Sequence, residues 1–598
     1  MKILLTAINA KYIHSNLAVY DLQAYARKEL AGESPVEIKI REYTINQQPD
    51  EILGSIYEEQ ADVLCLSCYI WNLQTVELLV RDLSRIRPGF PIWLGGPEVS
   101  YDSRDVLRRL PQVKGVMKGE GEETFACLCG LWGQGDPSDE DLAGVDGITF
   151  RGSDGQIVEN PWREPMDLDQ VPFVYQDLER FENKILYYES SRGCPFSCSY
   201  CLSSVDKKLR FRSFSLVKKE LQFFLDRKVP QVKFVDRTFN CGHAHAREIW
   251  QYIRDHDNGV TNFHFEVSAD LLNEEELELL GTMRPGLVQL EIGVQSTNPR
   301  TIREIRRTMD LEKVARATER IRQQGNIHQH LDLIAGLPYE DLASFTRSFD
   351  QVYRMKPHQL QLGFLKVLKG SWMKEQEEAY GLVCKWEPPY EVLRTRWLSY
   401  EDVRLLKGIE EMTEVYYNSR QFEYTMEELE REFASPFRMY EALWDYYRKK
   451  QLEEQQHRRS ARYEILLGFL EERIPGKQEY FRELLVYDYY LRENAKSRPG
   501  FAGEETVSAG EARAFYEREE KERNFLPAYE GFDKKQLRRM THLERFPQLG
   551  KTVLFDYLER SPLTGEARTC ILEGNRKEEN ITEKLENASC KNGIKSIE

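Results

Sequence analysis

The chain has 598 residues and a formal net charge of −16, with 83 basic against 99 acidic residues. A single hydrophobic core stops growing at about 250–300 residues, so this length predicts two to four domains. The excess of acidic residues argues against a broad nucleic-acid-binding face. Eleven cysteines scattered over a chain of this length do not suggest a disulfide framework and are typical of a reducing compartment.

The amino terminus begins with a short apolar run, residues 2–8. This run is shorter than the ~20 residues of a membrane span, and it lacks the pattern of a signal peptide. We therefore expect a cytoplasmic protein with no membrane partner.

Residues 1–140 alternate between strand and helix patterns. Strands are predicted at residues 2–8, 36–43, 62–70, 91–98 (with a turn) and 113–118, and helices at 16–29, 49–60, 75–86 and 103–110. This alternation predicts a doubly wound, Rossmann-like open sheet in an α/β protein. Such sheets bind ligands beyond the carboxyl ends of their strands. Four loops are expected there, at residues 9–16, 67–72, 95–98 and 119–122.

Two of these four loops contain glycines, Gly95-Gly96 and Gly119-Glu-Gly121. They suggest a large, flat ligand lying against the backbone. No Gly-x-Gly-x-x-Gly is present, so a nicotinamide dinucleotide is disfavoured. Cys65 and Cys68 form a Cys-x-x-Cys, but they lie inside a predicted strand and are interpreted as buried, inert thiols.

Residues 141–184 are predicted to be a linker that contains a hairpin at 148–158. Strand, loop and helix patterns return over residues 185–375. Six strands are predicted, at residues 185–188, 232–239, 263–269, 287–294, 330–337 and 360–367. Six βα units indicate a partial (β/α)6 barrel with its site at the carboxyl face.

Three cysteines follow the first of these six strands, Cys194, Cys198 and Cys201, at Cys-x3-Cys-x2-Cys spacing. A structural zinc site needs four protein ligands. Three thiolates suit a cubane iron–sulfur cluster whose fourth iron keeps an open position. The alternative is that three reduced core cysteines fall close together by chance.

This motif resembles that of the radical S-adenosylmethionine (radical SAM) superfamily. The resemblance implies a [4Fe-4S] cluster on Cys194, Cys198 and Cys201, with SAM bound at the open iron. It also implies one-electron cleavage of SAM to a 5′-deoxyadenosyl radical. Tyr200 places an aromatic ring beside the last thiol.

Polar residues lie at or near the carboxyl ends of four predicted barrel strands: Asp236, Glu266, Gln295 and Asp332. Such positions suit a polar ligand, although any one of them is also consistent with a solvated loop residue. Resemblance to the branch that includes oxygen-independent coproporphyrinogen oxidases implies that the strands with Glu266, Gln295 and Asp332 contact SAM. It also implies that Arg307 meets the SAM carboxylate, for which a guanidinium fork is suited. Arg303 and Arg306, within a turn of Arg307, are the alternatives.

The amino-terminal domain resembles the cobalamin-binding domain that precedes the barrel in many radical SAM proteins. The residues that the resemblance implies for cobalamin are His14, Ser67, Gly95, Gly96, Glu98, Gly119, Glu120, Gly121 and Glu122. The Asp-x-His-x-x-Gly string that supplies a cobalt ligand in cobalamin mutases is absent. His14 is therefore interpreted as an ordinary loop histidine more readily than as a cobalt ligand.

Residues 376–565 are predicted to form a mainly α-helical domain, and the charged residues 566–598 a disordered tail. The domain order resembles that of cobalamin-binding radical SAM proteins with an uncharacterised carboxyl-terminal domain.

This resemblance implies a cobalamin-dependent radical SAM enzyme, expected to methylate an unactivated carbon, with flavodoxin or ferredoxin as a reducing partner. The alternatives are a radical SAM oxidoreductase or ring-rearranging enzyme without methyl transfer, and a cobalamin or iron–sulfur sensor. A methylthiotransferase is disfavoured because a second cysteine trio is missing. The sequence does not name the substrate, which is a small molecule or a peptide.

Overall fold

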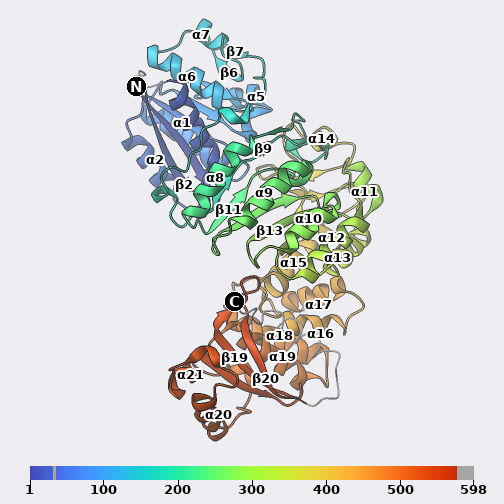
Figure 1. Ribbon diagram of the computed structural model, residues 1–598. Helices are drawn as coiled ribbons and strands as arrows, with labels where there is room; N and C mark the ends of the chain where they lie inside the picture. Colours follow the sequence, from blue (N-terminus) through green and yellow to red (C-terminus); the bar gives the residue numbers. More distant parts are fainter. Residues whose placement is uncertain (31–35, 206, 575–598) are drawn as a thin grey trace. The chain divides into compact units, whose positions relative to one another are not determined.

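The computed structural model describes residues 1–30, 36–205 and 207–574. The chain divides into two compact units (Figure 1). Unit 1 comprises Met1–Gln351, Met355–Pro357 and Leu362–Val403, and unit 2 comprises Val352–Arg354, His358–Gln361 and the chain from Arg404 onwards. Unit 1 contains both predicted α/β domains, and the candidate site lies within it.

The first sheet of unit 1 has seven strands in the order β2-β1-β3-β4-β5-β6-β7. Its parallel strands are β1 (Lys2–Asn9), β2 (Glu37–Thr44), β3 (Val63–Ser67), β4 (Ile92–Gly95) and β5 (Gly115–Met117). An antiparallel edge is formed by β6 (Ile148–Arg151) and β7 (Ile157–Glu159). The predicted hairpin therefore exists, but it extends the first sheet instead of standing in a linker, because β6 pairs directly with β5.

Helices accompany the first sheet along the chain. They are α1 (Leu17–Glu29), α2 (Pro49–Glu58), α3 (Leu73–Ile86), α4 (Pro97–Ser100), α5 (Ser103–Arg109), α6 (Glu122–Gln134) and α7 (Asp139–Ala143). The Asn16 side chain caps α1 by accepting a hydrogen bond from the Val19 amide, which satisfies an unpaired donor of the first turn. Seven of the eight β1 residues are buried, as in a strand covered on both faces. The predicted doubly wound sheet is confirmed.

The second sheet of unit 1 has the order β15-β14-β13-β12-β11-β8. Its strands are β8 (Leu186–Tyr188), β11 (Gln231–Phe234), β12 (Asn262–Val267), β13 (Val288–Gln295), β14 (His328–Ala335) and β15 (Gln359–Phe364). These are the six predicted barrel strands. Its helices are α8 (Phe214–Asp226), α9 (His243–Asp255), α10 (Glu274–Gly281), α11 (Pro299–Glu304), α12 (Leu311–Gln324) and α13 (Leu342–Tyr353).

The helices cover one face of the second sheet, where α8, α9, α10 and α12 lie side by side (Figure 1). Burial alternates along β13: Val288, Leu290 and Ile292 are fully buried, whereas the residues between them are not. Strand side chains alternate between faces, so the apolar set packs against the helices. The polar set, which includes Glu291 and Gln295, therefore faces the lumen.

A short ribbon and a further group of elements complete unit 1. The ribbon is β9 (Ser191–Arg192) paired antiparallel with β10 (Arg210–Phe211). After β15 come α14 (Trp372–Glu375), β16 (Val383–Cys384) and β17 (Val392–Arg394). Residues 193–209, which carry the three predicted ligand cysteines, form the loop that the ribbon closes; we call it the cluster loop.

Unit 2 is mainly helical, as predicted. Its helices are α15 (Tyr400–Thr413, shared with unit 1), a π-helical turn at Glu414–Asn418, α16 (Glu423–Glu430), α17 (Pro436–Lys449), α18 (Arg459–Arg473), α19 (Gln478–Arg492), α20 (Ala509–Glu522) and α21 (Lys534–Met540). It also contains an antiparallel sheet of β18 (Thr541–Phe546), β19 (Lys551–Arg560) and β20 (Ala567–Gly574).

Strand β20 corrects one predicted boundary. The tail was expected to begin at residue 566, but residues 567–574 pair with β19. Charged residues such as Arg568 hid the strand, although Cys570 and Leu572 pack against an apolar cluster around Leu554. The rest of the predicted tail, residues 575–598, lies outside the described residues.

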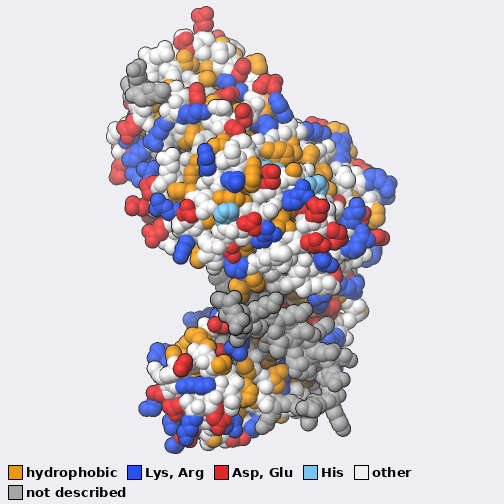
Figure 2. Space-filling model, viewed as in Figure 1, with side chains coloured by type: hydrophobic (Ala, Val, Ile, Leu, Met, Phe, Trp, Pro, Cys, Tyr) orange, Lys and Arg blue, Asp and Glu red, His pale blue; other side chains and the backbone are white. Residues whose placement is uncertain are grey.

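Acidic and basic side chains are interspersed over the described part of the face drawn in Figure 2, without a broad area of one sign. A search of residues 1–30, 36–205 and 207–574 finds no helix that is long and apolar enough to cross a membrane.

Candidate active site

The cluster loop leaves β8 and buries its first two cysteines. Cys194 and Cys198 are each 8% exposed, Cys201 is half-buried, and all three are free of disulfides. Gly193 has φ +92°, and a Cβ at this position would lie 2.6 Å from the Lys208 carbonyl oxygen. Only glycine tolerates both conditions, so it allows the two ends of the loop to approach each other.

Backbone groups, not thiols, anchor the cluster loop. The Ser199 amide donates to the Ile305 carbonyl at 2.9 Å, and the Ser199 carbonyl accepts from the Met373 amide at 2.8 Å. Ser204 Oγ donates to the carbonyls of Cys198 and Cys201 at 2.9 and 2.6 Å. The fold therefore holds the loop while leaving all three sulfur atoms available as ligands.

Arg307 is the arginine that reaches the cluster loop. Its Nη1 lies 3.9 Å from Cys198 Sγ, and its Nη2 donates to the Gly293 carbonyl. Arg303 and Arg306 are exposed, and Arg306 lies over the Trp372 ring instead. The geometry therefore separates Arg307 from the two alternatives left open by the sequence.

Gln295 ends β13 in a strained conformation. Its φ is +71°, and the register with β14 shifts between Gly293 and Gln295, which marks a bulge. A positive φ is uncommon for a residue other than glycine and clusters at functional sites. Gln295 Oε1 and Arg307 Nε are both buried without a hydrogen-bond partner. Unpaired buried polar atoms of this kind fit a polar ligand that the chain is built to receive.

Glu266 on β12 and Asp332 on β14 face the same lumen from the two strands that flank β13. Glu266 has neither a hydrogen bond nor an ion pair among the described residues, and burial, with help from Glu291, raises its pKa to about 7. Asp332 Oδ1 lies 3.0 Å from His330 Nε2, but neither atom is aligned for a hydrogen bond. Burial raises the pKa of Asp332. Burial lowers the pKa of His330, but the Asp332 carboxylate outweighs this and raises it.

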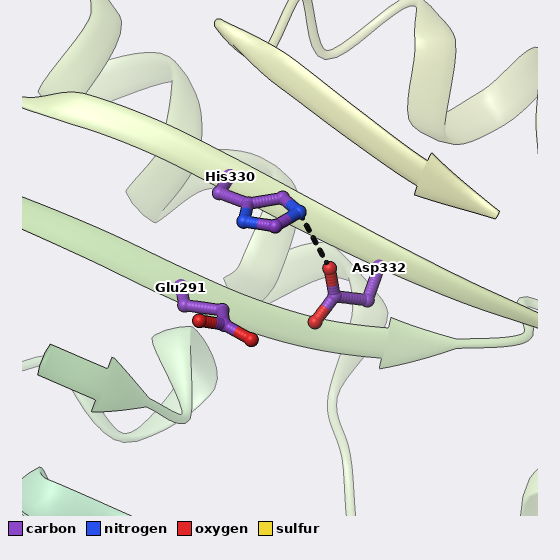
Figure 3. Close-up of side chains that lie close together, drawn as sticks. All are labelled: Glu291, His330 and Asp332. Atoms are coloured by element: carbon purple, nitrogen blue, oxygen red, sulfur yellow. Dashed lines mark ion pairs between the residues drawn. The ribbon is translucent and has the colours of Figure 1, made fainter. Parts of the chain in front are cut away.

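Figure 3 shows Glu291, His330 and Asp332 pointing toward one another from β13 and β14, with ligand atoms within 4.8 Å of each other. Lys233 Nζ and His264 Nε2 each lie 3.0 Å from Glu291 Oε2. Burial opposes ionisation of Glu291, but His264 and Lys233 outweigh it and lower its pKa to about 2. Because these partners already neutralise Glu291, the group has little net charge with which to attract a cation.

These lumen residues were missed by the sequence analysis. Along each of these strands, polar or charged side chains alternate with apolar ones. The polar residues in question are Lys233 in β11, His264 in β12, Glu291 in β13 and His330 in β14. That period of two is the signal that would have found them.

Asp236 lies two residues beyond the carboxyl end of β11, as predicted, but its carboxylate is engaged by protein groups. It is fully buried and accepts hydrogen bonds from the Ser190 amide, Ser190 Oγ and Ser191 Oγ at 3.0, 2.7 and 2.6 Å. Burial raises its pKa to about 6. These donors belong to the segment that leads from β8 into the cluster loop, so Asp236 braces that segment. Tyr200, by contrast, lies in the loop and packs against the apolar cluster around Leu337 and Met373.

The glycines of the first sheet serve packing in at least two cases. Gly96 has φ +107°, and a Cβ there would lie 2.6 Å from the Cys68 carbonyl oxygen. A Cβ at Gly121 would lie 2.9 Å from Leu22 Cδ2 in α1. These two packing contacts are sufficient to explain why glycine occupies positions 96 and 121, without a flat ligand. Gly95 has only ordinary contacts, and the Gly119 amide donates to Ser100 Oγ at 3.3 Å.

The three predicted cobalamin-binding glutamates are engaged by groups from the following domain. Glu98 accepts from Tyr390 Oη and lies 3.2 Å from Lys369 Nζ. Glu120 and Glu122 pair with arginines of the β9–β10 ribbon. Burial raises the pKa of the Cys65 and Cys68 thiols, which agrees with their interpretation as inert.

His14 and Ser67 lie at the carboxyl ends of β1 and β3. His14 Nδ1 lies 2.6 Å from Tyr187 Oη, so one of its two ring nitrogens is occupied. Ser67 Oγ accepts from Asn16 Nδ2 at 3.3 Å. Beside them Trp71 is 42% exposed and stacks on Tyr69 at 4.4 Å between ring centroids. The sequence analysis missed this flat aromatic surface.

Three family models match the chain in succession. Residues 3–128 match the B12 binding domain, residues 188–352 the Radical SAM superfamily, and residues 378–561 a family described as a protein of unknown function (DUF4080). The two predicted ligand classes, cobalamin and SAM, are thereby confirmed at the level of the domain families.

Two similar proteins are methyltransferases by name. One is 2-(S-pantetheinyl)-carbapenam-3-carboxylate methyltransferase of Streptantibioticus cattleyicolor, 26% identical over 50% of this chain and 46% of that protein. The other is the cobalamin-dependent radical SAM methyltransferase TokK of Streptomyces tokunonensis, 25% identical over 54% and 50%. The chain spans about half the length of the curated relatives it matches.

A solved structure shares the fold over most of the length. The cobalamin-dependent SAM radical enzyme OxsB, with aqua-cobalamin bound, superposes with a TM-score of 0.57 at 15% identity, over 84% of this chain and 82% of that one. The order of sheets, the cysteine loop and the three family matches agree with one another. The chain therefore contains a radical SAM domain, preceded by a B12 binding domain and followed by a DUF4080 domain.

Proposed function

We propose that this protein is a cobalamin-dependent radical SAM methyltransferase that methylates an unactivated carbon. The observation that carries the proposal is the position of three free thiols beside the unpaired polar atoms of Gln295 and Arg307, at the carboxyl end of the second sheet. The names of the two relatives support methyl transfer as the reaction class.

Each side chain of the site has a proposed task. Cys194, Cys198 and Cys201 would hold a [4Fe-4S] cluster, and their number leaves one iron for the amino and carboxylate groups of SAM. Arg307 offers a charged fork for that carboxylate. Glu266, Gln295 and Asp332 would accept or donate hydrogen bonds to the remaining polar groups of SAM.

When bound, the cluster supplies one electron that cleaves SAM to a 5′-deoxyadenosyl radical, and cobalamin supplies the methyl group. The chain's own contribution is to orient the reactants and to exclude water. On the lumen side, His264 and His330 are only 7% and 6% exposed, and exclusion of bulk solvent there would protect a reactive carbon radical from side reactions.

The carboxyl ends of β1, β3 and β4 are the proposed cobalamin surface. His14, Ser67, Gly95 and the exposed ring of Trp71 lie there. Because one nitrogen of His14 is occupied by Tyr187, only the other remains for a ligand.

Partners and location are part of the proposal. One-electron delivery calls for a reductant of flavodoxin or ferredoxin type, and free thiols with a reduced cluster call for the cytoplasm. The substrate is a small molecule or a peptide.

The first test needs no substrate. Anaerobically reconstituted protein with dithionite and SAM is expected to form 5′-deoxyadenosine, and Cys198→Ala to reduce this at least about a thousandfold, since the open cluster is lost. Cys384→Ala, a half-buried cysteine outside the motif, is the matched control and should behave as wild type. Equal activity in wild type and Cys198→Ala contradicts the proposal.

The second test concerns cobalamin and methyl transfer. After growth with the vitamin, cobalt is expected to co-purify with the chain, and a ratio near zero removes cobalamin from the proposal. Cells fed trideuteromethyl-methionine should accumulate a labelled metabolite that a deletion strain lacks. Loss of an unlabelled product instead would favour radical chemistry without methyl transfer.

A further inference from the structure

The β9–β10 ribbon closes the cluster loop with only two residues per strand. Arg192 and Arg210 occupy directly paired positions in it. Arg192 lies two residues before Cys194. So short a ribbon has few backbone hydrogen bonds of its own, and isolated two-stranded ribbons are marginally stable. Its position therefore depends on what its side chains contact.

The two arginines meet two glutamates that follow β5 of the first sheet. Arg210 Nη1 lies 3.0 Å from Glu120 Oε2, and Arg210 Nη2 also contacts the same carboxylate, which makes the pair bidentate. Arg192 Nη2 lies 2.7 Å from Glu122 Oε1, and its Nη1 lies 3.4 Å from Glu120 Oε2. Glu189 binds the remaining face of Arg192, at 3.0 Å to Nε.

These contacts are not surface ion pairs. The exposed fractions of the Glu122 and Arg210 side chains are 7% and 12%, and those of Arg192 and Glu120 are 18% and 19%. Removing one partner of a buried pair leaves a charge without compensation, which is strongly unfavourable. Such pairs fix geometry more effectively than exposed pairs, which contribute little.

The glutamates stand on a rigid base. Glu122 is the first residue of α6, and α6 is held against α1 by the close approach of Gly121 to Leu22. Glu120 accepts a further hydrogen bond from the Met166 amide at 3.2 Å, and Arg210 donates to the Met166 carbonyl at 2.7 Å. The pairs thus connect the start of α6 in the first domain to both ends of the cluster loop.

We infer that Glu120, Glu122, Arg192 and Arg210 form a latch that positions the cluster loop relative to the B12 binding domain. They are positioning residues, since they act through the ribbon and not on a reacting atom. The inference changes the predicted role of Glu120 and Glu122 from cobalamin contacts to loop positioning. It rests on the proposed function only where it concerns the distance between the two cofactors.

The latch is tested in the full-length chain without cofactors by hydrogen–deuterium exchange. In Glu120→Gln/Glu122→Gln, exchange over residues 189–212 is expected to rise about tenfold or more, with no change in the rest of unit 1. Glu123→Gln is the matched control, because Glu123 is the adjacent helix residue and is 36% exposed, with Arg163 at 3.6 Å. No rise in the double variant, or an equal rise in the control, overturns the latch.

A second set of variants separates coupling from general damage. If Glu120 and Arg210 act through each other, Glu120→Gln/Arg210→Gln should raise exchange no further than either single change. If the rise in exchange of the double variant equals the product of the two single rises, the two side chains act independently and the pairing is overturned.

The positioning role is tested on reconstituted, cobalamin-loaded protein. Relaxation enhancement of the cob(II)alamin electron-spin signal by the reduced cluster should report a narrow range of distances in wild type and in Glu123→Gln. A broader range is expected in Glu120→Gln/Glu122→Gln. An unchanged range overturns the positioning role. If wild type binds neither group, the proposed function fails, whereas the exchange experiment still decides the latch.

Discussion

The polar residues at the strand ends of the two sheets in unit 1 differ in one respect. In the first sheet they are paired across to the next domain: Glu42 Oε2 lies 2.8 Å from Lys184 Nζ, and Glu98 and Glu120 have their own cations. In the second sheet, Gln295 Oε1 and Arg307 Nε are buried without partners. The paired polar groups of the first sheet hold two parts of the protein together, whereas the unpaired polar groups of the second sheet are available to a ligand.

Energy explains the distinction. A buried polar group left without a hydrogen bond costs about 1–3 kcal/mol. A ligand that satisfies several such groups recovers this cost, which contributes to its affinity. A carboxylate already held by a guanidinium has no comparable gain to offer. The strand ends of the second sheet are therefore better candidates for ligand contacts than the glutamates of the first.

Among variants that keep all three cluster cysteines, the largest expected effect comes from filling the space beside the unpaired groups. In Gly293→Ala, the new Cβ would lie 2.3 Å from Gln295 Nε2 and 3.5 Å from Arg307 Nη2. Displacing these groups by about 1 Å should reduce 5′-deoxyadenosine formation about a hundredfold. Gly363→Ala in β15, where a Cβ meets nothing closer than 3.5 Å, should change it little. Equal effects would mean that the space beside Gln295 is not special.

The next effect concerns Arg307. Lysine keeps the charge but loses the fork, so Arg307→Lys should weaken SAM binding about tenfold or more, as measured by equilibrium dialysis. Arg303→Lys changes an exposed arginine nearby and should leave the dissociation constant unchanged. An equal loss of SAM affinity in Arg303→Lys would mean that the contact with the SAM carboxylate cannot be assigned to Arg307 over Arg303.

A pH dependence is expected from Glu266. Burial and then Glu291 raise its pKa to about 7, so below that pH its carboxyl group is neutral and carries an O–H donor, and above it the group is an anion that only accepts hydrogen bonds, more strongly. SAM binding should therefore tighten as pH rises from 6 to 8, by at most about tenfold. Glu266→Gln should flatten this profile while Arg307 remains in place. A profile of equal slope in the variant would exclude Glu266.

The smallest expected effect is on stability and lies near the latch. Asp21 of α1 is buried and has no hydrogen bond or ion pair among the described residues. Burial, then Glu122 and Glu189, raise its pKa well above the usual range. The folded protein therefore keeps a proton that the unfolded chain loses, and stability falls as pH rises above about 4.

Asp21→Asn removes this penalty. It should raise the free energy of unfolding by about 1–3 kcal/mol at pH 8 and by less at pH 5, as measured by urea denaturation. Asp105→Asn, at a site 66% exposed, is the control and should change stability little. A loss of stability at pH 8 in Asp21→Asn would show that the carboxylate is ionised and paired.

The cysteine motif could be predicted because its information is local. Cys194, Cys198 and Cys201 lie within eight consecutive residues, and their number alone favours a cluster over zinc. The strands were predictable for the same reason, since apolar runs repeat along the chain. Arg307 could be placed only within a turn, because spacing does not show which neighbouring side chain faces inward.

The latch could not be predicted, because its partners are remote in sequence. Glu120 and Arg210 are 90 positions apart and Glu122 and Arg192 are 70 apart. Nothing in the string Gly119-Glu-Gly-Glu122 reveals that its carboxylates meet arginines. The packing contact of Gly96 could not be predicted for a related reason: it is with Cys68, just beyond the neighbouring strand β3, which only the sheet brings close.

The ribbon at the base of the cluster loop has a consequence for assembly of the holoprotein. Its ends are fastened by contacts between protein groups, and none of these contacts involves a cluster ligand. Metal and sulfide can then be inserted into, and lost from, an already folded polypeptide, and a damaged centre can be rebuilt in place. Chemical reconstitution under anoxic conditions should therefore succeed without a denaturation and refolding step.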